Sequence, residues 1–125
     1  MSERVFVYGT LRKGGSNDFR MAECRFLGPG MVRGQIYRID WYPGLVPGDV
    51  GDVAGEIYEV ESGAMRALDE FEGLPEGKME GGGYRRVKAM VYPESGEPLE
   101  AWIWQWIGGI EGCTRLESGD WLNPG

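Results

Sequence analysis

The chain has 125 residues, a length that predicts one domain over residues 1–125 with a single buried core. Its formal net charge of −7 argues against surfaces that bind nucleic acid or anionic membranes, because these need clustered Lys and Arg side chains. The sequence contains no histidine, which excludes Ser-His-Asp and Cys-His catalytic relays and zinc sites that use histidine.

The first predicted strand covers Arg4 to Tyr8 and ends in four consecutive β-branched or aromatic residues, which favour a pleated strand. Gly9, Thr10 and Leu11 follow it. Gly9 permits backbone angles that other residues resist, so successive N–H groups in this loop can converge on a bound anion. The alternative interpretation is an ordinary turn at the end of a strand.

Glycine accounts for 22 of the 125 residues and stands between apolar runs, which predicts many short strands joined by turns. The segment from Gly55 to Val60 alternates with period two, as expected for a strand with one buried face. Tyr42-Pro43-Gly44 is interpreted as a turn, with a place in a pocket wall as the alternative. The later strands are predicted at Met31 to Ile39, Asp52 to Val60, Gly83 to Tyr92 and Pro98 to Ile107.

Two connections are predicted between the later elements. Residues 93–98 contain two prolines and a glycine and are expected to form a long hairpin turn. Residues 77–83 are expected to form a mobile loop. The Gly81-Gly82-Gly83 run within it lacks the Lys-Ser/Thr or GxGxxG context of phosphate-binding loops, so no phosphate site is predicted there.

One helix is predicted over Ala64 to Glu72, with Ser62 as its N-cap and Gly73 just past its end. At about 100° per residue, its apolar side chains gather on one side of the helix. These residues are Ala64, Met65, Leu68 and Phe71.

Of three neighbouring acids on this helix, only Glu72 is predicted to face the apolar interior, roughly 50° from the centre of the apolar side. Asp69 is expected at the edge of the apolar side of the helix, and Glu70 is expected on the opposite, solvent-facing side. Burial disfavours the charged carboxylate and raises its pKa to a range in which the group can accept and donate a proton. Glu72 is therefore a candidate general acid/base, and the alternative is a helix-end glutamate that turns back to solvent.

The run from Ala101 to Ile107 places three tryptophans on one face of a predicted strand and two isoleucines on the other. We interpret it as a central strand packed on both sides. A base-stacking platform is the alternative, but it would need a basic groove that this acidic chain does not offer.

The remaining residues predict no cofactor and no metal site. Cys24 and Cys113 stand far apart without CxxC spacing, which favours free thiols and a cytoplasmic location. Asp18, Asp49 and Asp52 lack the spacing of a calcium loop. Neither a signal peptide nor a membrane-spanning run is expected from the sequence.

Taken in order, several of these segments resemble the gamma-glutamylcyclotransferase-like superfamily, most of all its gamma-glutamylamine cyclotransferase branch and the small bacterial and archaeal relatives. The likeness covers nearly the whole chain. It implies an α+β fold, a compact mixed β-barrel of about five to seven strands with a few short helices and a pocket beside the loop after the first strand. The segments that carry it are Val7 to Leu11, Gly55 to Val60, Leu68 to Gly73, Tyr84 to Arg86 and the tryptophan-rich last strand.

The resemblance also implies a reaction and roles for particular residues. The family converts γ-glutamyl amides to 5-oxoproline and a free amine, using the substrate's own α-amine as the nucleophile. Glu72 matches the family's catalytic acid, and Tyr84 matches an aromatic residue that borders the pocket. The loop residues that would bind the γ-glutamyl head through backbone amides are Tyr8, Gly9, Thr10 and Leu11.

Two departures from the family pattern leave the leaving amine undetermined. Residues 74–83 form a longer and more glycine-rich connection than the family's usual one. At Thr10-Leu11 the sequence differs from that of the glutathione-pathway cyclotransferases, which favour a serine as the next residue. A non-catalytic small-molecule-binding module with the same fold and pocket remains the alternative function. The sequence predicts neither the identity of the substrate nor the oligomeric state.

Overall fold

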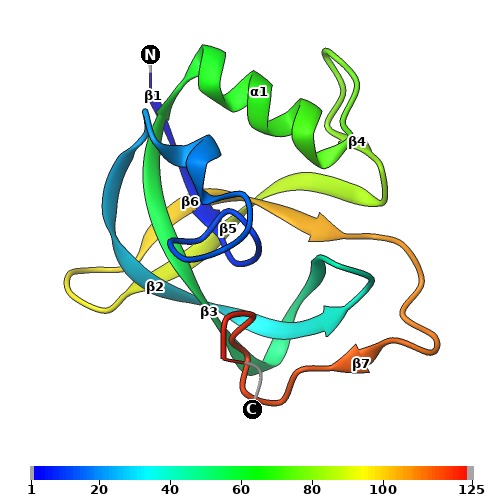
Figure 1. Cartoon of the computed structure of the whole chain (residues 1–125). Coiled ribbons are helices and arrows are strands. Elements are labelled where there is room, and N and C mark those ends of the chain that lie inside the picture. Colours follow the sequence, from blue (N-terminus) through cyan, green and yellow to red (C-terminus); the bar gives the residue numbers. More distant parts are fainter. Residues whose placement is uncertain (1, 124–125) are drawn as a thin grey trace.

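The computed structural model describes residues 2–123, in which the strands form one seven-stranded sheet (Figure 1). Strand β5 also pairs with β2, so β5, β6, β1, β3 and β2 close into a barrel, while β4 and β7 extend the sheet. In chain order the elements are β1 (Ser2–Val7), the 3₁₀ helix η1 (Asp18–Met21), β2 (Arg25–Arg38), β3 (Pro43–Glu61), α1 (Ser62–Glu72), β4 (Glu80–Gly81), β5 (Tyr84–Pro93), β6 (Leu99–Trp106) and β7 (Thr114–Arg115).

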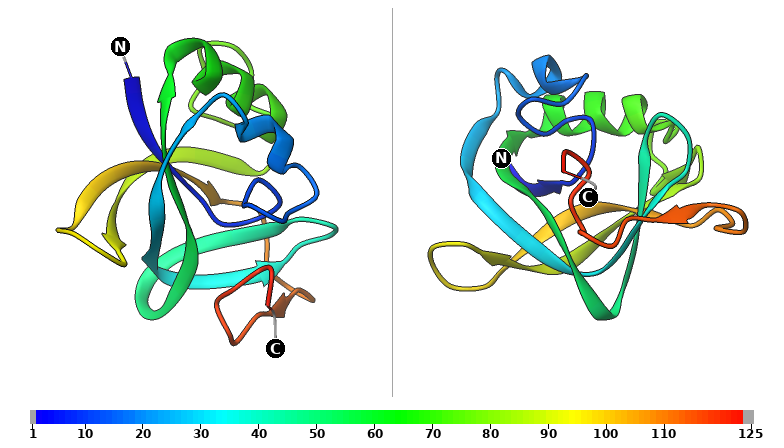
Figure 2. Two further views of the ribbon diagram at one scale, coloured as in Figure 1. Left: turned by 60° about the vertical axis from the view of Figure 1, so that its left-hand side comes forward. Right: turned by 60° about the horizontal axis from the view of Figure 1, so that its bottom comes forward.

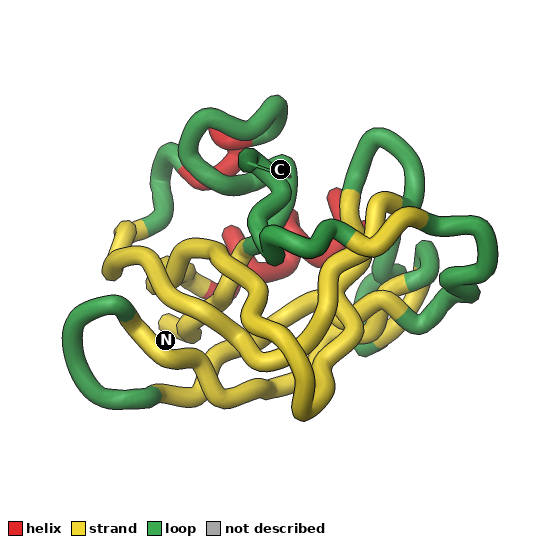
Figure 3. The backbone as a smooth tube through the Cα atoms, turned by 90° about the horizontal axis from the view of Figure 1, so that it is seen from below, coloured by secondary structure: helices red, strands yellow, loops and turns green. Residues whose placement is uncertain are grey.

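The barrel contains both kinds of strand pairing. Strand β1 runs antiparallel to β3 and parallel to β6, with Val5 opposite Trp102. The closing contact between β2 and β5 places Gly30 opposite Pro93. Seen from below, the strands lie in front of the helical segments (Figure 3). The mixed β-barrel with few helices is therefore confirmed.

Strands β2 and β3 pair as a hairpin, and both begin earlier than predicted. Strand β2 begins at Arg25, where the prediction was Met31, and β3 begins at Pro43, where the prediction was Asp52. Figure 2 shows this hairpin, from blue through cyan to green, curving around the molecule. Its register shifts at Gly34, which pairs with Pro47 while Arg33 pairs with Asp52. Residues 48–51 therefore bulge out, and the bulge lets the strand bend and continue past its prolines and glycines.

Alternate residues of β1 contribute to two apolar clusters, as the period of a strand requires. Val5 and Val7 belong to the cluster beneath α1, together with Leu68 of that helix. Phe6 packs into the second cluster with Ile103 of β6. The helix therefore covers one end of the barrel (Figure 1).

Helix α1 begins earlier than predicted, because Glu61 occupies the N-cap position and Ser62 is already helical. Its end is as predicted: Gly73 adopts a left-handed conformation with φ of 95°. The N–H of Gly73 donates to the carbonyl of Glu70 (3.0 Å), and the N–H of Leu74 donates to that of Asp69 (2.8 Å). This pattern is a Schellman motif, and the buried Leu74 fixes the helix end that carries Glu72.

Strand β6 lies between β5 and β1, so its central position is confirmed. Trp104 and Ile103 are buried, whereas Ile107 lies beyond the end of the strand and is exposed. Cys24 and Cys113 are free thiols, as predicted. No helix within residues 2–123 combines the length and apolar character needed to cross a membrane.

Candidate active site

A cavity of about 290 Å³ opens at the end of β1, between the loop that follows this strand and the end of α1. Every site residue named from the sequence lies in its wall, and so does the start of β3. The lining residues are Phe6, Val7, Tyr8, Gly9, Thr10, Leu11, Trp41, Tyr42, Pro43, Phe71, Glu72, Gly73, Gly82, Tyr84 and Trp104. The structure thus brings together segments far apart in the chain.

The loop after β1 leaves backbone donors unused. The N–H of Arg12 donates to the carbonyl of Gly9 (3.1 Å), and the N–H of Asn17 donates to the carbonyl of Thr10 (2.9 Å). These bonds shape the turn, but the N–H groups of Thr10 and Leu11 have no partner within residues 2–123. Two adjacent unpaired N–H groups in a cavity wall can bind an anionic or carbonyl oxygen.

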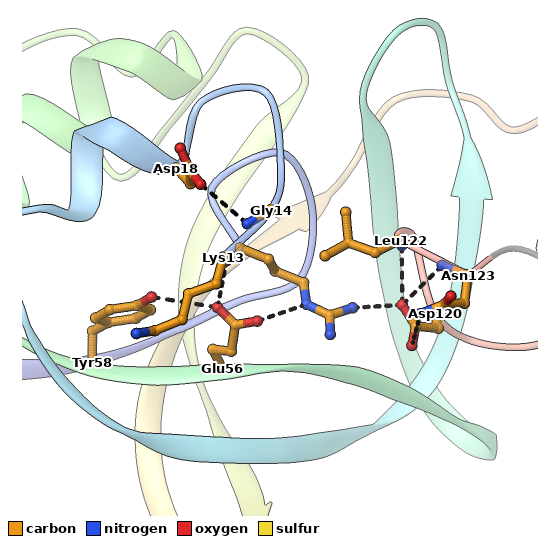
Figure 4. Close-up of polar contacts among 9 residues, drawn as sticks. Lys13, Gly14, Asp18, Glu56, Tyr58, Asp120, Leu122 and Asn123 are labelled. Atoms are coloured by element: carbon orange, nitrogen blue, oxygen red, sulfur yellow. Dashed lines mark hydrogen bonds and ion pairs between the residues drawn. The ribbon is translucent and has the colours of Figure 1, made fainter.

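Glu56 of β3, which is 7% exposed, holds this loop in place (Figure 4). Its carboxylate accepts hydrogen bonds from the N–H of Lys13 (2.8 Å), the Nε of Arg12 (3.2 Å) and the hydroxyl of Tyr58 (3.3 Å). Nη1 of Arg12 also lies 2.6 Å from Oδ1 of Asp120. Burial alone would raise the pKa of Asp120, but its contacts with Arg12 lower it.

Glu56 belongs to the predicted alternating strand, but its contact with the loop was not predicted. The available signal was its position in the strand, because Glu56 has the same period-two phase as the buried residues Tyr58 and Val60. An acid among apolar positions of one strand face needs donors, and here two of the three come from the loop and the third from Tyr58 of the same strand.

Glu72 lies on the last turn of α1, half-buried, in the wall of the cavity. No hydrogen bond or ion pair engages its carboxylate within residues 2–123. Burial, and to a smaller extent the negative charge of Asp69, raises the pKa of Glu72 from its ordinary value of 4.5 to about 7. Both protonation states are therefore populated near neutral pH, as a general acid/base requires.

The prediction that Glu72 alone among its neighbours turns inward is only partly right. Glu70 is exposed, but Asp69 is half-buried and held by two partners. Nε1 of Trp104 donates to Oδ1 of Asp69 (2.8 Å), and Nε of Arg86 lies 2.9 Å from the same oxygen. Asp69 is thus fixed as a charged neighbour of Glu72. No group of three or more Cys, Asp or Glu side chains in the described part of the chain is placed to hold a metal ion.

Tyr8 and Tyr84 line the cavity with hydroxyls that are engaged by the backbone. The hydroxyl of Tyr8 donates to the carbonyl of Trp104 (2.7 Å) and accepts from the N–H of Leu45 (3.2 Å). The hydroxyl of Tyr84 donates to the carbonyl of Pro43 (2.5 Å). Burial raises the pKa of both hydroxyls, so they stay protonated and keep their hydrogen bonds to the backbone of the cavity wall.

The glycine run of residues 81–83 packs closely against the end of α1 and against β6. A Cβ atom added to Gly82 would lie 2.7 Å from the carbonyl oxygen of Glu72, and one added to Gly81 would lie 2.6 Å from that of Gly73. At Gly83 it would lie 2.5 Å from the ring of Trp106. The run therefore supports the helix end. Gly81 also belongs to β4, within the segment expected to be a loop.

Trp41 and Tyr42, which precede β3, also line the cavity, so the pocket-wall alternative for Tyr42 and Pro43 is right. Trp41 was not singled out from the sequence. It is 59% exposed.

Known proteins resemble this chain over nearly its full length. The family model described as "Gamma-glutamyl cyclotransferase, AIG2-like" matches residues 5–123. The gamma-glutamylcyclotransferase family protein YtfP of Escherichia coli strain K12 is 33% identical over 121 residues, covering 96% of each chain. Its counterpart in Citrobacter rodentium is 34% identical over 121 residues, again covering 96% of each chain.

Solved structures agree with these sequence relatives. The crystal structure of the uncharacterized protein PH0828 from Pyrococcus horikoshii superposes with a TM-score of 0.72 and 31% identity, covering 95% of this chain and 89% of that one. An AIG2-like protein from Mus musculus gives a TM-score of 0.76 with 27% identity, covering 88% of this chain and 81% of that one. The chain therefore belongs to the AIG2-like gamma-glutamyl cyclotransferase family.

Proposed function

We propose that the protein is a cyclotransferase that converts a γ-glutamyl amine or amide to 5-oxoproline and a free amine, with Glu72 as general acid/base and no cofactor. One observation carries the proposal. The unpaired carboxyl of Glu72, whose pKa is raised to about 7, lines the same cavity as the unpaired N–H groups of Thr10 and Leu11.

The loop from Tyr8 to Leu11 would hold the γ-glutamyl head through its backbone N–H groups, as the family resemblance implies. Holding the glutamyl arm bent brings the α-amine close to the γ-carbonyl carbon. Ring closure of this kind has effective molarities of about 10⁵–10⁸ M, so positioning alone lowers the barrier substantially. The network around Glu56 supports this step because it fixes the loop.

Glu72 would move one proton during the reaction. As the α-nitrogen attacks the γ-carbonyl carbon and the new C–N bond forms, the carboxylate accepts a proton from that nitrogen. As the old C–N bond breaks, the carboxyl returns the proton to the departing nitrogen. No Ser or Cys nucleophile takes part, because the nucleophile belongs to the substrate. The free thiols fit a reducing, cytoplasmic location.

The first test replaces Glu72 by glutamine and follows release of 5-oxoproline from γ-glutamyl amines and γ-glutamyl amino acids. We expect Glu72→Gln to fold and to lower kcat by about 10²–10⁴, the usual effect of losing a positioned acid/base. Glu70→Gln is the matched control, because Glu70 is exposed on the same helix. A Glu72→Gln enzyme within about threefold of wild-type turnover would remove Glu72 from the mechanism. Absence of 5-oxoproline release by the wild-type protein would favour the binding-module alternative.

The second test separates cyclisation from hydrolysis. In ¹⁸O-labelled water, attack by the α-amine gives unlabelled 5-oxoproline, whereas attack by water gives labelled glutamate. We expect unlabelled 5-oxoproline when the product is analysed promptly by mass spectrometry. Labelled glutamate as the main product would overturn the cyclotransferase proposal and leave the fold and family unchanged.

A further inference from the structure

A row of aromatic rings leads from solvent into the wall of the cavity. The ring of Trp41 meets that of Tyr42 edge-on, with centroids 5.1 Å apart. Tyr42 lies 6.3 Å from both Tyr84 and Trp106, and those two rings lie 5.2 Å apart. We call Trp41 and Tyr42 the aromatic rim. The deeper rings contact Tyr42, and Tyr42 in turn contacts Trp41.

Trp41 is a large apolar side chain exposed at the edge of a ligand cavity. It is 59% exposed although it lines the cavity. Apolar area of this kind gains from being covered by an apolar part of a ligand. Stacking on an indole adds to that gain and favours a flat, aromatic partner.

The cavity wall carries no Lys or Arg among the described residues, and its ionisable groups are Glu72 and tyrosines. The Cζ atom of Arg20 lies 4.2 Å from the centroid of the Phe71 ring, but Arg20 is exposed and does not line the cavity. A carboxylate on the leaving amine would therefore enter an apolar wall without a cation and near the Glu72 carboxyl. Burying an unpaired charge in this way is unfavourable.

We infer that the leaving amine of the substrate carries an aromatic group and no carboxylate, and that Trp41 contacts the aromatic group. The inference rests on the proposed function, because it takes the head of the substrate to lie between the loop after β1 and Glu72. The substrate class is then the γ-glutamyl derivatives of aromatic amines, as distinct from γ-glutamyl amino acids.

The kinetic test compares three amides that share the glutamyl head. They are γ-glutamyl phenethylamide, γ-glutamyl ethylamide and γ-glutamylphenylalanine, which adds only a carboxylate to the first. We expect kcat/KM for the phenethylamide to exceed that for the ethylamide by about 10-fold to 100-fold, the range that stacking of one ring provides. γ-Glutamylphenylalanine should fall at least about tenfold below the phenethylamide.

Trp41→Ala should reduce the phenethylamide preference to below about threefold, chiefly by lowering kcat/KM for the phenethylamide. The core tolerates this substitution because Trp41 is exposed. Val50→Ala is the control: Val50 is an apolar residue of β3 that is 69% exposed and does not line the cavity. The control should keep the wild-type preference.

A binding measurement makes the inference independent of turnover. Glutaric acid monophenethylamide and monoethylamide lack the α-amine and cannot cyclise, so calorimetry gives their Kd values directly. We expect tighter binding of the phenethylamide in wild type and loss of that preference in Trp41→Ala. If these results hold while no amide releases 5-oxoproline, the proposed function fails and the aromatic subsite stands.

Other results overturn the inference and leave the proposed function intact. One is turnover of all three amides with equal kcat/KM. Another is a preference for an amide bearing a terminal ammonium group, which would mean that the rim binds a cation through its ring faces. A preference for the phenethylamide that survives in Trp41→Ala would equally contradict the role of Trp41.

Discussion

Replacing Glu72 by glutamine should stabilise the protein above neutral pH and change its stability much less in acid. Burial raises the pKa of Glu72 from 4.5 to about 7, so the folded protein holds this proton more tightly than the unfolded chain does. Folding therefore takes up a proton between these two pH values, and the free energy of unfolding falls as pH rises through them. Above pH 7 the ionised Glu72 imposes its full desolvation cost on the folded state.

The size of the effect follows from the pKa of Glu72. The difference between 4.5 and about 7 corresponds to about 3 kcal/mol. Because the side chain keeps some contact with solvent in the cavity, we expect about 2 kcal/mol. Glutamine has nearly the same shape and does not ionise. The stability of Glu72→Gln relative to wild type should therefore increase by about 2 kcal/mol between about pH 4.5 and pH 8.

Urea unfolding of both proteins at about pH 4.5, 6 and 8 measures this difference. Carboxyl groups distant from Glu72 affect the stability of both proteins equally, so their contributions cancel. Glu70→Gln, on the exposed side of the same helix, should show no such increase. A difference between Glu72→Gln and wild type that stays constant within about 0.5 kcal/mol over this range would refute the reasoning.

Three other outcomes are expected. Glu56→Gln removes the charged acceptor that holds the loop after β1 and should raise KM about tenfold with a smaller loss of kcat. Glu59→Gln, on the same strand, should leave KM unchanged. An unchanged KM in Glu56→Gln would show that this loop does not bind the substrate. Gly82→Ala combines a φ of 58° with a Cβ contact of 2.7 Å to the Glu72 carbonyl. Gly82→Ala should lower the free energy of unfolding by about 1–3 kcal/mol. The control Gly77→Ala should lower it less, because the added Cβ would meet nothing within 4 Å. Equal decreases in the two variants would contradict the close packing at Gly82. Activity should survive exhaustive chelation, and its loss in EDTA with recovery on adding zinc or magnesium would contradict a metal-free mechanism.

Local patterns in the sequence were sufficient for the parts of the site that depend on short-range rules. The end of α1 follows from Gly73, and the inward side of Glu72 follows from helical periodicity. The strand before Gly9 follows from its apolar run. These features involve neighbours within a few residues, so a single sequence contains the information that specifies them.

Features that depend on distant partners were not predictable in this way. The first half of β3 contains Pro43 and Pro47, which favour turns, yet pairing with β2 makes it a strand. Glu56 gains two of its donors from a loop more than forty residues earlier in the chain. Trp41 joins the cavity through tertiary pairing, because β3, which it precedes, pairs near its start with β6, with Leu45 opposite Gln105. In each case a tertiary contact decides the outcome.

The bond between Arg12 and Asp120 spans 108 positions of the sequence. It joins the loop expected to hold the substrate to a segment that is synthesised much later than the loop. During synthesis on the ribosome, the loop after β1 cannot form this bond until Asp120 has been made, and β1 cannot pair with β6 until Trp102 has been made. Long-range pairings of this kind slow folding, so the pocket should form late in the folding of the protein.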